Sequence, residues 1–286
     1  MLILRNGLLG AFVVLLFGSF EPAIDLHAVI EKMLNTVIQL KGVQYRLRST
    51  ERIKDDPKLK NALLFTKVME QPVRKFYIRI ESEDHKGTEM LYAHGENNDK
   101  IKVSANWVPT LNLSPFSSFL TKGQRHTPYS TGYMPVYRII GAGLKKADLA
   151  KRFTVYFNYE GEVDFYQHKC YKIRIKDPEY AYINYKALPG ETAFSIATKF
   201  AISEYAILER NDISYFDDDL SGKTLSIPSS YAKESVLYIE ISTHLPLLQE
   251  MSDERGVFEK YEFFNVVVNP NFAADEFKPS FKGYNF

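Results

Sequence analysis

Side chains capable of catalysis or metal binding are scattered along the chain and form no recognisable catalytic pattern. None of the six histidines pairs with another at the i, i+4 spacing of a helical zinc site. No Gly-x-Ser-x-Gly nucleophile turn occurs, and the three aspartates at 217–219 lack the glycine and glutamate spacing of a calcium loop. The sequence therefore predicts no catalytic residue, no metal site and no cofactor, and we interpret the protein as a non-enzyme.

One acidic pair leaves a catalytic alternative open. Glu160 and Glu162 could act as the carboxylates of a glycan-processing enzyme, provided that the fold placed them across a cleft. Cys170 is the single cysteine, which excludes an internal disulfide and a cysteine-based zinc site. It lies among alternating strand residues, so we predict a buried structural thiol.

Arg125 and His126 lie close in sequence to an aromatic residue, Tyr129. Together these side chains could contact an anionic head group. A plain surface loop is the other interpretation, and the sequence favours it. Neither interpretation makes the pair catalytic.

Charge and composition exclude one class of partner and favour one kind of fold. The 286 residues carry 36 lysines and arginines against 35 aspartates and glutamates, which gives a net charge of +1. Such a balance supplies no basic field for generic nucleic-acid binding, so no nucleic-acid partner is expected. The 20 phenylalanines and 19 tyrosines favour sheet, because aromatic side chains suit a pleated, half-buried surface.

The first 20 residues predict export. Arg5 precedes an uncharged, mostly apolar stretch at 6–20, and the first charge after that stretch is Glu21. A short positive start followed by about a dozen apolar residues is typical of a secretory signal peptide, and it falls short of the ~20 that span a bilayer. We therefore assign residues 1–20 to a cleaved signal peptide and expect the protein in the periplasm or elsewhere in the cell envelope. An uncleaved membrane anchor is the alternative.

Hydrophobic periodicity predicts a mainly β body with antiparallel strands. Apolar residues follow helical spacing at 24–40, and after residue 42 the period changes to two. Short polar turns separate consecutive strands, which indicates antiparallel meanders rather than βαβ units. The expected elements are helices at 24–40, 114–120 and 135–149, and strands that include 153–159, 171–175, 236–241, 245–251 and 257–268.

A second pattern interrupts these strands between residues 183 and 230. Strand, helix, helix and strand follow one another there. A core is marginal below ~50 residues, so this unit should lean on the surrounding sheet. The sequence thus predicts a body formed by 24–182 and 231–286, with an insert at 183–230.

The insert resembles the LysM domain, a glycan-binding module. LysM domains open on Tyr-x-Val-x-x-Gly-Asp-Thr-Leu, continue with a helix carrying Ile-Ala and with a central Asn, and close on Gly-x-x-Leu-x-Ile-Pro. The matching residues here are Tyr185, Gly190, Thr192, Ile196, Ala197, Phe200, Asn211, Gly222, Leu225, Ile227 and Pro228. Glu191 and Ala193 depart from the pattern, since Asp and Leu are usual at those positions.

LysM domains bind glycan through the loop before the first helix and the loop after the second. The resemblance therefore implies a site for peptidoglycan or a chitooligosaccharide-like glycan at Gly190, Glu191, Thr192, Ala193, Asn211, Asp212 and Ile213. A helix N-terminus offers free backbone N–H donors to the acetamido carbonyls and hydroxyls of such a glycan. The alternative is structural: Gly190 makes a turn, Thr192 caps a helix and Asn211 ties a loop.

The body is similar to the LolA/LppX-type envelope fold, a curved antiparallel half-open barrel with helices plugging its mouth. The similarity rests on the helix at 33–40 running into 45–52, on 168–173, on Leu245-Pro246-Leu247, and on Asn269-Pro270 before Phe277. The chain also looks similar to an uncharacterised family of this fold, a domain of unknown function, that carries a LysM-like insert at this place. The implied fold class is mainly β (α+β), a half-open barrel with plugging helices plus a small βααβ LysM-like insert.

These resemblances imply an exported cell-envelope binding protein. A curved sheet of about ten strands encloses more volume than three short helices fill, so we predict an apolar hollow with the helix at 135–149 as a movable lid. That hollow would hold a lipid, an acyl chain or a lipoprotein, and the insert would contact peptidoglycan. The alternative is a non-catalytic envelope scaffold without lipid cargo, whose interior is filled by its own aromatic side chains. The oligomeric state stays open.

Overall fold

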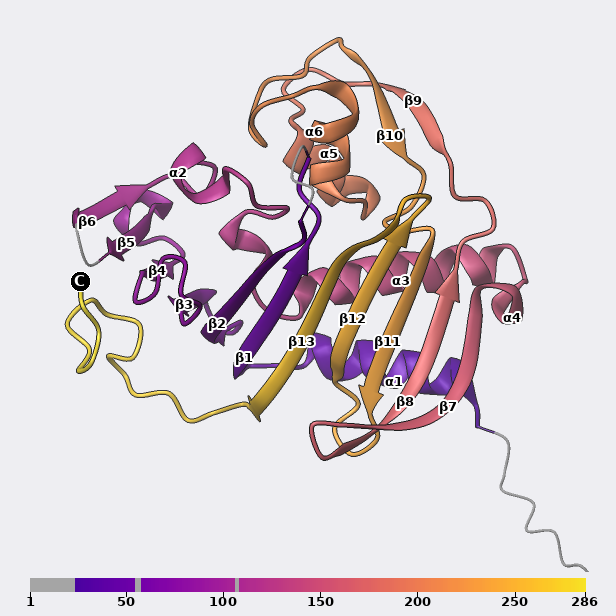
Figure 1. The fold of residues 1–286 in the computed structure, drawn as a ribbon, viewed down its shortest axis with the longest axis horizontal. Coiled ribbons are helices and arrows are strands. Elements are labelled where there is room, and N and C mark those ends of the chain that lie inside the picture. The colour runs from indigo at the N-terminus through magenta and orange to yellow at the C-terminus, as the bar shows by residue number, and fades with distance from the viewer. Residues whose placement is uncertain (1–23, 55–57, 106–107) are drawn as a thin grey trace, which may run out of the picture.

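The computed structural model describes residues 24–54, 58–105 and 108–286, which form an open sheet with helices on one face and a smaller unit at one end (Figure 1). The signal peptide predicted at 1–20 lies outside the described residues. Within the described ranges, no helix is both long enough and apolar enough to cross a membrane.

The elements follow one another in an order that separates the body from the insert. The body contains α1 (Leu26–Ile38), β1 (Gly42–Glu51), β2 (Lys60–Met69), β3 (Lys75–Ile80), β4 (Glu89–Ala93), β5 (Ile101–Ala105), β6 (Val108–Leu113), α2 (Ser118–Thr121), α3 (Met134–Leu149), α4 (Phe153–Tyr156), β7 (Phe157–Phe165), β8 (His168–Lys176), β11 (Glu234–Glu240), β12 (Pro246–Asp253) and β13 (Gly256–Val268). The insert contains β9 (Tyr182–Lys186), α5 (Ala193–Phe200), α6 (Glu204–Asn211) and β10 (Thr224–Pro228).

Eleven strands of the body form one sheet in the order β6-β5-β4-β3-β2-β1-β13-β12-β11-β8-β7, and the neighbouring strands pair antiparallel. Strand β1 joins the two halves, since Leu47 pairs with Leu64 of β2 on one side and with Phe263 of β13 on the other. The sheet ends at β6 and β7 and is therefore not closed. The prediction of a mainly β, antiparallel and open architecture is confirmed.

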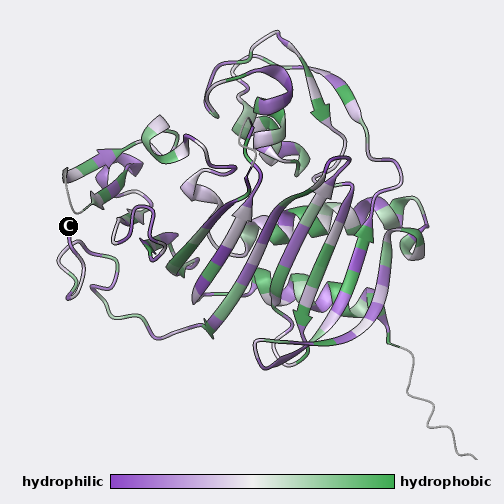
Figure 2. Ribbon diagram, viewed as in Figure 1, coloured by the Kyte–Doolittle hydropathy of each residue, from purple (hydrophilic) through white to green (hydrophobic). Residues whose placement is uncertain are grey.

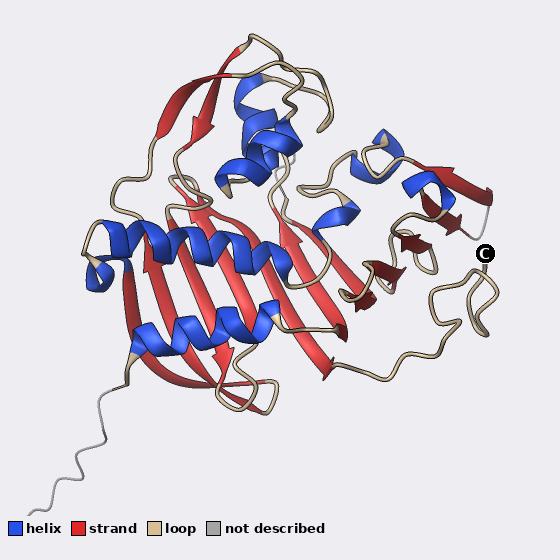
Figure 3. Cartoon of the chain, turned by 180° about the vertical axis from the view of Figure 1, so that it is seen from behind, coloured by secondary structure: helices blue, strands red, loops and turns tan. Residues whose placement is uncertain are grey.

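Helices α1 and α3 lie side by side across one face of the sheet (Figure 3). The side chain of Asp25 caps α1 by accepting the backbone N–H of Ala28 at 3.1 Å. Both helices bury one apolar stripe and expose the other side, which is the arrangement of a helix layer on a core. Figure 2 shows that hydrophobic and hydrophilic residues are mixed along the strands. In β11, buried and half-buried positions alternate strictly, as expected when one face of a strand packs on a core.

The space between the sheet and the helices is filled rather than hollow. Tyr45 of β1 and Phe263 of β13 meet Tyr133, the residue before α3, with ring centroids 6.0 and 4.7 Å from the Tyr133 ring. These rings belong to one continuous cluster of buried side chains from α1, α3 and the strands. The predicted apolar hollow is thus wrong for this conformation, because aromatic side chains occupy the volume that three helices leave.

The two best-defined hollows of the described residues lie elsewhere. One, of about 390 Å³, opens to solvent along α3 and is lined by Gly141, Leu144, Lys145, Asp148 and Leu149. The other, of about 30 Å³, lies between α3 and the insert. The smaller one has room for about one water molecule.

Two expected elements differ from the structure. The strand predicted at 153–159 begins only at Phe157, because Phe153–Tyr156 forms a helical turn, α4, that leads from α3 into the sheet. Stacking of Phe153 on Phe157 at 4.9 Å stabilises that turn. The helix predicted at 114–120 is only Ser118–Thr121, since the Ser117 side chain caps it by accepting the N–H of Phe119.

Gly42 provides a test of this packing, because the start of β1 has no room for a side chain. A Cβ on Gly42 would lie 2.9 Å from the carbonyl oxygen of Val68 and 3.0 Å from the Phe272 ring. We expect Gly42→Ala to lower the free energy of unfolding by about 1–3 kcal/mol, the usual cost of overpacking. Urea denaturation measures this.

Gly141→Ala in α3 is the matched control. The added Cβ would meet nothing closer than Leu34 at 4.0 Å. It should raise the stability by about 0.5–1 kcal/mol, because alanine is the better helix former. Equal effects of the two substitutions would contradict the packing described for β1.

Candidate functional site

The insert has the strand–helix–helix–strand order that the sequence indicates, and its residues form a core that also includes Ile53 of the body. Strands β9 and β10 pair antiparallel, with Leu225 opposite Tyr185. The βααβ arrangement is what a LysM domain requires, but its glycan site remains a prediction. The seven residues predicted for that site lie on the two loops that flank α5 and α6.

The first loop is held by contacts within the insert. Gly190 turns the chain at φ +76°, and its N–H donates to Ser221 Oγ at 2.7 Å. The Glu191 carboxylate accepts hydrogen bonds from the Tyr185 hydroxyl at 2.7 Å, the Leu188 N–H at 2.8 Å and the Lys199 ammonium at 2.9 Å. The Leu188 N–H, followed by Lys199 and Tyr185, holds the pKa of Glu191 below its usual range. Glu191 therefore stays ionised and closes the turn.

Thr192 and Ala193 begin α5. The Thr192 side chain accepts the Ser195 N–H at 3.1 Å, and Ser195 Oγ accepts the Thr192 N–H at 2.9 Å, which makes a reciprocal cap. The Ala193 side chain is fully buried in the core of the insert, so only its backbone can meet a ligand.

The second loop is also tied to its surroundings. The Asn211 amide donates to the carbonyl oxygens of Ile207 at 2.8 Å and Ser226 at 3.0 Å, and its Oδ1 accepts the Ser226 N–H at 2.8 Å. Asp212 adopts the left-handed conformation that ends α6 and forms an ion pair with Lys54 at 2.7 Å. Ile213 packs half-buried against the insert core. Structural roles thus account for each polar side chain in the set, and ligand contacts would have to come from the exposed edges and backbone of these loops.

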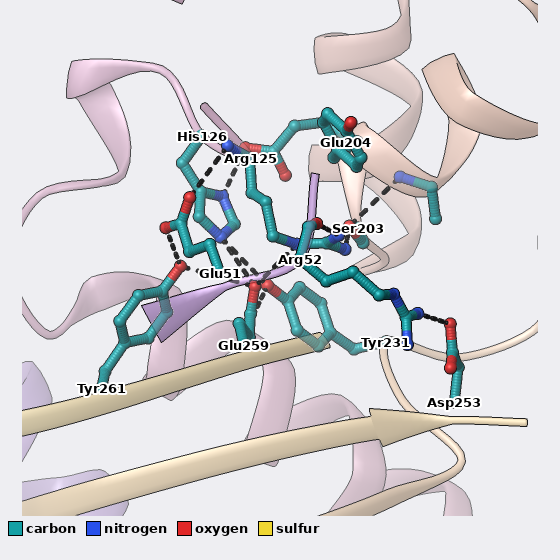
Figure 4. A network of polar contacts seen from close by, with 12 residues as sticks. Glu51, Arg52, Arg125, His126, Ser203, Glu204, Tyr231, Asp253, Glu259 and Tyr261 are labelled. Carbon is teal, nitrogen blue, oxygen red and sulfur yellow. Dashed lines mark hydrogen bonds and ion pairs between the residues drawn. The ribbon is translucent and has the colours of Figure 1, made fainter. Parts of the chain in front are cut away.

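A second cluster of polar side chains joins the insert to the body, and we call it the junction network (Figure 4). His126, on the segment between α2 and α3, lies between two carboxylates. Its Nδ1 lies 2.8 Å from Glu204 of α6, in the insert, and its Nε2 lies 3.2 Å from Glu259 of β13, in the sheet. One imidazole therefore bridges the two parts of the protein.

Arg125 holds the same junction from the neighbouring position. Its guanidinium contacts Glu259 at 3.4 Å, donates to the Arg52 carbonyl oxygen at 2.9 Å and reaches Ser203 Oγ at 3.4 Å. The rings of Tyr205 and Phe258 lie 4.6 and 4.5 Å from it. Arg125 is only 3% exposed, so this cation is fully enclosed by its partners.

Two tyrosines complete the network on the sheet side. The Tyr231 hydroxyl donates to Glu259 at 2.5 Å, and the Tyr261 hydroxyl donates to Glu51 at 2.7 Å. Glu51 also accepts the Arg125 backbone N–H at 3.2 Å. Every carboxylate named in the network thus has a cation or a hydroxyl beside it, as buried charges require.

The charges fix the protonation states at the junction. Burial by itself lowers the pKa of His126, but the carboxylates of Glu204 and Glu259 outweigh it and hold that pKa well above its usual range. Burial raises the pKa of Glu259, and contact with His126 and Arg125 reverses this, so the pKa lies below its usual range. The structure therefore pairs the His126 imidazolium with the ionised carboxylate of Glu259.

Both interpretations of Arg125 and His126 from the sequence are wrong. The pair neither lies on a plain surface loop nor faces solvent for an anionic head group, because carboxylates of the chain itself neutralise it. No local sequence signal indicated this, because Glu259, which the structure buries at 1% exposure, lies beside Lys260 and close to Glu262 in β13 and so resembles an ordinary exposed acid. Its partner Glu204 lies 78 residues from His126, a separation that no local pattern connects.

The remaining chemical candidates are an acidic pair on an edge strand and a buried thiol. Glu160 and Glu162 lie on the edge strand β7, and hydrogen bonds from Arg174 lower the pKa of Glu160 to about 2. A carboxyl with that pKa cannot serve as a general acid. Cys170 is buried, as expected, and burial raises the pKa of its thiol to about 12.

Comparison with known proteins gives structural similarity only. No protein-family model matches the chain, and no curated protein does. Lipoprotein LppX from Mycobacterium tuberculosis is similar over 87% of this chain and 97% of its own, at 13% identity and a TM-score of 0.42. A DUF1329 family protein from Desulfovibrio piger (10% identity, 88% and 96% of the chains, TM-score 0.36) and a LolA superfamily protein from Nitrosomonas europaea (10% identity, 89% and 98%, TM-score 0.30) are also similar.

The names of these similar structures include LolA and LppX, to which the body was found similar from its sequence. All three TM-scores lie below 0.5, so function has to come from the chain's own geometry. None of the three names a LysM domain, and the resemblance of the insert stays a prediction.

His126 provides a pH test of the junction. A group whose pKa is raised on folding stabilises the protein below its unfolded pKa of about 6.5, and that stabilisation is lost as the pH rises through the raised pKa. We expect the free energy of unfolding to fall between neutral and alkaline pH. His126→Gln should remove this dependence and cost about 3 kcal/mol at neutral pH, because it leaves Glu204 and Glu259 buried without their cation.

His27→Gln is the control. His27 forms a partly exposed ion pair with Asp148 at 3.2 Å, and such pairs contribute about 0–1 kcal/mol. This variant should keep the alkaline loss of stability. If His126→Gln unfolds with the same pH profile as the native protein, His126 is not an imidazolium in the folded state.

Proposed function

We propose that this protein is a non-catalytic binding protein of the cell envelope, exported by its N-terminal segment. Its helix-covered sheet takes up one apolar chain with a polar head group, such as a lipid, an acyl chain or the acyl anchor of a lipoprotein. The insert holds the protein on glycan that contains N-acetylglucosamine. Support comes from the helix–sheet core and from the two loops of the insert.

The observation that carries the proposal is the hydroxyl of Tyr133. It is buried, at 1% exposure, in the apolar core where α3 begins, and it has no hydrogen-bond partner among the described residues. A buried hydroxyl without a partner costs about 1–3 kcal/mol. A polar head group that enters with an apolar chain would supply the missing partner and recover that energy.

Entry requires α3 to move, and its ends suit such a motion. Gly132 adopts φ +92° two residues before the helix, and Lys151 adopts φ +53° two residues after it. At the start, the Gly132 N–H donates to the Tyr45 hydroxyl at 3.0 Å. At the end, Lys146 pairs with Asp177 at 2.8 Å. These polar ties reform easily, whereas the apolar stripe of α3 can exchange protein contacts for an acyl chain.

The energy of such an exchange is adequate. Burial of methylene groups yields roughly 0.8 kcal/mol each. Ten methylenes would thus supply about 8 kcal/mol, which corresponds to micromolar affinity if little is spent on displacing α3. The packed interior is then the closed state of a carrier.

A second candidate is an envelope scaffold without cargo. The filled interior favours it, because the buried aromatic rings already cover the sheet. The carrier and the scaffold differ in one observable, which is whether any acyl chain binds.

Tyr133→Phe separates the two candidates. We expect it to stabilise the free protein by about 1 kcal/mol, since it removes an unpaired hydroxyl, and to weaken binding of a fluorescent fatty acid by about five- to tenfold. Thermal unfolding and fluorescence titration measure the two effects. Tyr45→Phe is the matched control and should destabilise the free protein, because the Gly132 N–H then loses its acceptor.

A native protein that binds no fatty acid probe would contradict the carrier function and leave the scaffold. Binding that Tyr133→Phe does not weaken would retain a carrier but remove Tyr133 from its head-group site.

The glycan role has its own test. The native protein should co-sediment with purified peptidoglycan, and Ile213→Glu, which places a charge in the predicted binding loop, should reduce the bound fraction several-fold. Ile183→Glu on β9 is the control, because it adds the same charge to the insert at a position that is 48% exposed and lies outside the two loops. Equal loss in both variants would point to damage of the insert rather than to a glycan site.

A further inference from the structure

The C-terminal segment, residues 269–286, contains no helix or strand and lies against the body near β2–β5 (Figure 1). It contacts the strands through Lys67, Tyr77, Glu89 and Leu91. Their strand neighbours, such as Phe76 and Val68, point into the helix-covered core. Because side chains alternate along a strand, the segment covers the opposite side of the sheet, which we call the outer face.

At the centre of the outer face, a lysine ammonium lies inside a cage of aromatic rings. The Lys67 Nζ is 5.6 Å from the rings of Phe65 and Tyr77, which belong to the sheet. It is also 5.1 Å from the ring of Phe281 and 5.3 Å from that of Tyr284, which belong to the segment. Glu276 of the segment forms an ion pair with the same ammonium. The sheet and the segment thus each supply half of the surroundings of one buried cation.

A buried carboxylate marks the far end of the contact. Glu89 is fully buried, and its two oxygens accept the Asn285 backbone N–H at 3.0 Å and the Asn285 side-chain amide at 2.8 Å. Next to it, the rings of Tyr284 and Tyr77 stack at 3.9 Å with an interplanar angle of 6°. The partners of two buried, opposite charges of the sheet, Lys67 and Glu89, therefore come from the segment.

Two paired charges with aromatic rings between them are features of a peptide-binding site. A buried charge is costly unless it is paired, so a ligand for this face must bring a carboxylate to Lys67 and amide donors to Glu89. Between them it must bring aromatic rings to the ammonium, one of which stacks on Tyr77 as Tyr284 does. Residues 276–285 present these groups in this order.

The connection to the body resembles a tether rather than a structural element. The Asn269 side chain accepts the N–H groups of Lys41 at 2.8 Å and Gly42 at 3.2 Å, which fixes where the segment begins. Beyond it, no strand ladder joins the segment to the sheet. A ligand held by a short tether has a high effective concentration, and a free competitor must overcome that advantage.

We propose that the outer face of β2–β5 is a recognition site for short aromatic peptides that carry a carboxylate, and that residues 272–286 fill it as a built-in, exchangeable ligand. A partner protein that presents a carboxylate, two aromatic rings and a terminal amide side chain in the same order docks there by displacing the segment. This site is independent of the acyl-chain function, because it lies on the other side of the sheet.

The experiment uses the full chain with a protease site inserted between Asn271 and Phe272, so that the segment can be cut after folding. A fluorescent synthetic peptide of residues 272–286 is then added, and its exchange into the cut protein is followed by anisotropy. We expect one peptide to bind per chain while the body keeps its circular dichroism and cooperative unfolding. Lys67→Met should weaken binding at least tenfold, and Lys100→Met, an exposed lysine in a turn, should leave it within twofold.

Matched peptides keep the test informative if Lys67→Met fails to fold. Glu276→Gln in the peptide should weaken binding about tenfold, and Lys282→Gln, at an exposed position, should not. The proposal is overturned if the body loses its fold when the cut segment leaves, because the segment is then structural. It is equally overturned if labelled peptide never enters the cut protein, or if Glu276→Gln and Lys282→Gln bind alike.

Discussion

An open sheet of eleven strands exposes two faces, and the covering of these faces organises the whole molecule. Apolar side chains on one face require a layer of their own, and α1 and α3 supply it. The outer face of β2–β5 carries aromatic and charged side chains, and the C-terminal segment covers this face. The insert contributes to neither layer and is attached at one end of the sheet instead. Each region with a possible function is thus a cover or an attachment on this sheet.

Buried charge, rather than apolar contact, decides how the attachments are held. At the junction, Glu259 of the sheet lies beside His126 and Arg125, and His126 also contacts Glu204 of the insert. Because an unpaired buried ion is strongly unfavourable, these residues hold one another in a single arrangement. The segment that carries His126 leads directly into α3, so the same cluster that fixes the insert also fixes the start of the helix layer. The proposed motion of α3 would therefore begin beyond the junction, at Gly132.

Local patterns in the sequence were sufficient for the architecture but not for the contacts between distant elements. Alternation identified the antiparallel strands, and helical spacing identified α1 and α3 to within two or three residues at each end. The order of the insert followed from turn residues such as Gly190 and from the cap at Thr192, because these act over three or four positions. The short turn α4 was missed because its residues, Phe153–Tyr156, are all aromatic or β-branched and therefore favour a strand.

Neither the junction network nor the filled interior could be predicted from local sequence patterns. From the sequence, His126 was interpreted as part of a surface loop. Its partners Glu204 and Glu259 lie 78 and 133 residues away, so no local pattern connects them to it. The sequence likewise gives no sign that Tyr133 is buried. Only the packed core shows that its hydroxyl has no hydrogen-bond partner in the described chain. Sequence periodicity gives the direction of a side chain but not how much volume the opposing layer fills. The predicted hollow failed for that reason.

The central claim is that the helix–sheet core opens to hold one acyl chain. Native mass spectrometry of the protein, gently extracted from the envelope of the producing cell, tests this most directly. We expect part of the protein to carry one additional mass in the range of a lipid or fatty acid, and we expect that mass to disappear when the chain is unfolded and refolded without lipid. Only the unliganded mass, both after extraction and after incubation with excess fatty acid, would contradict it.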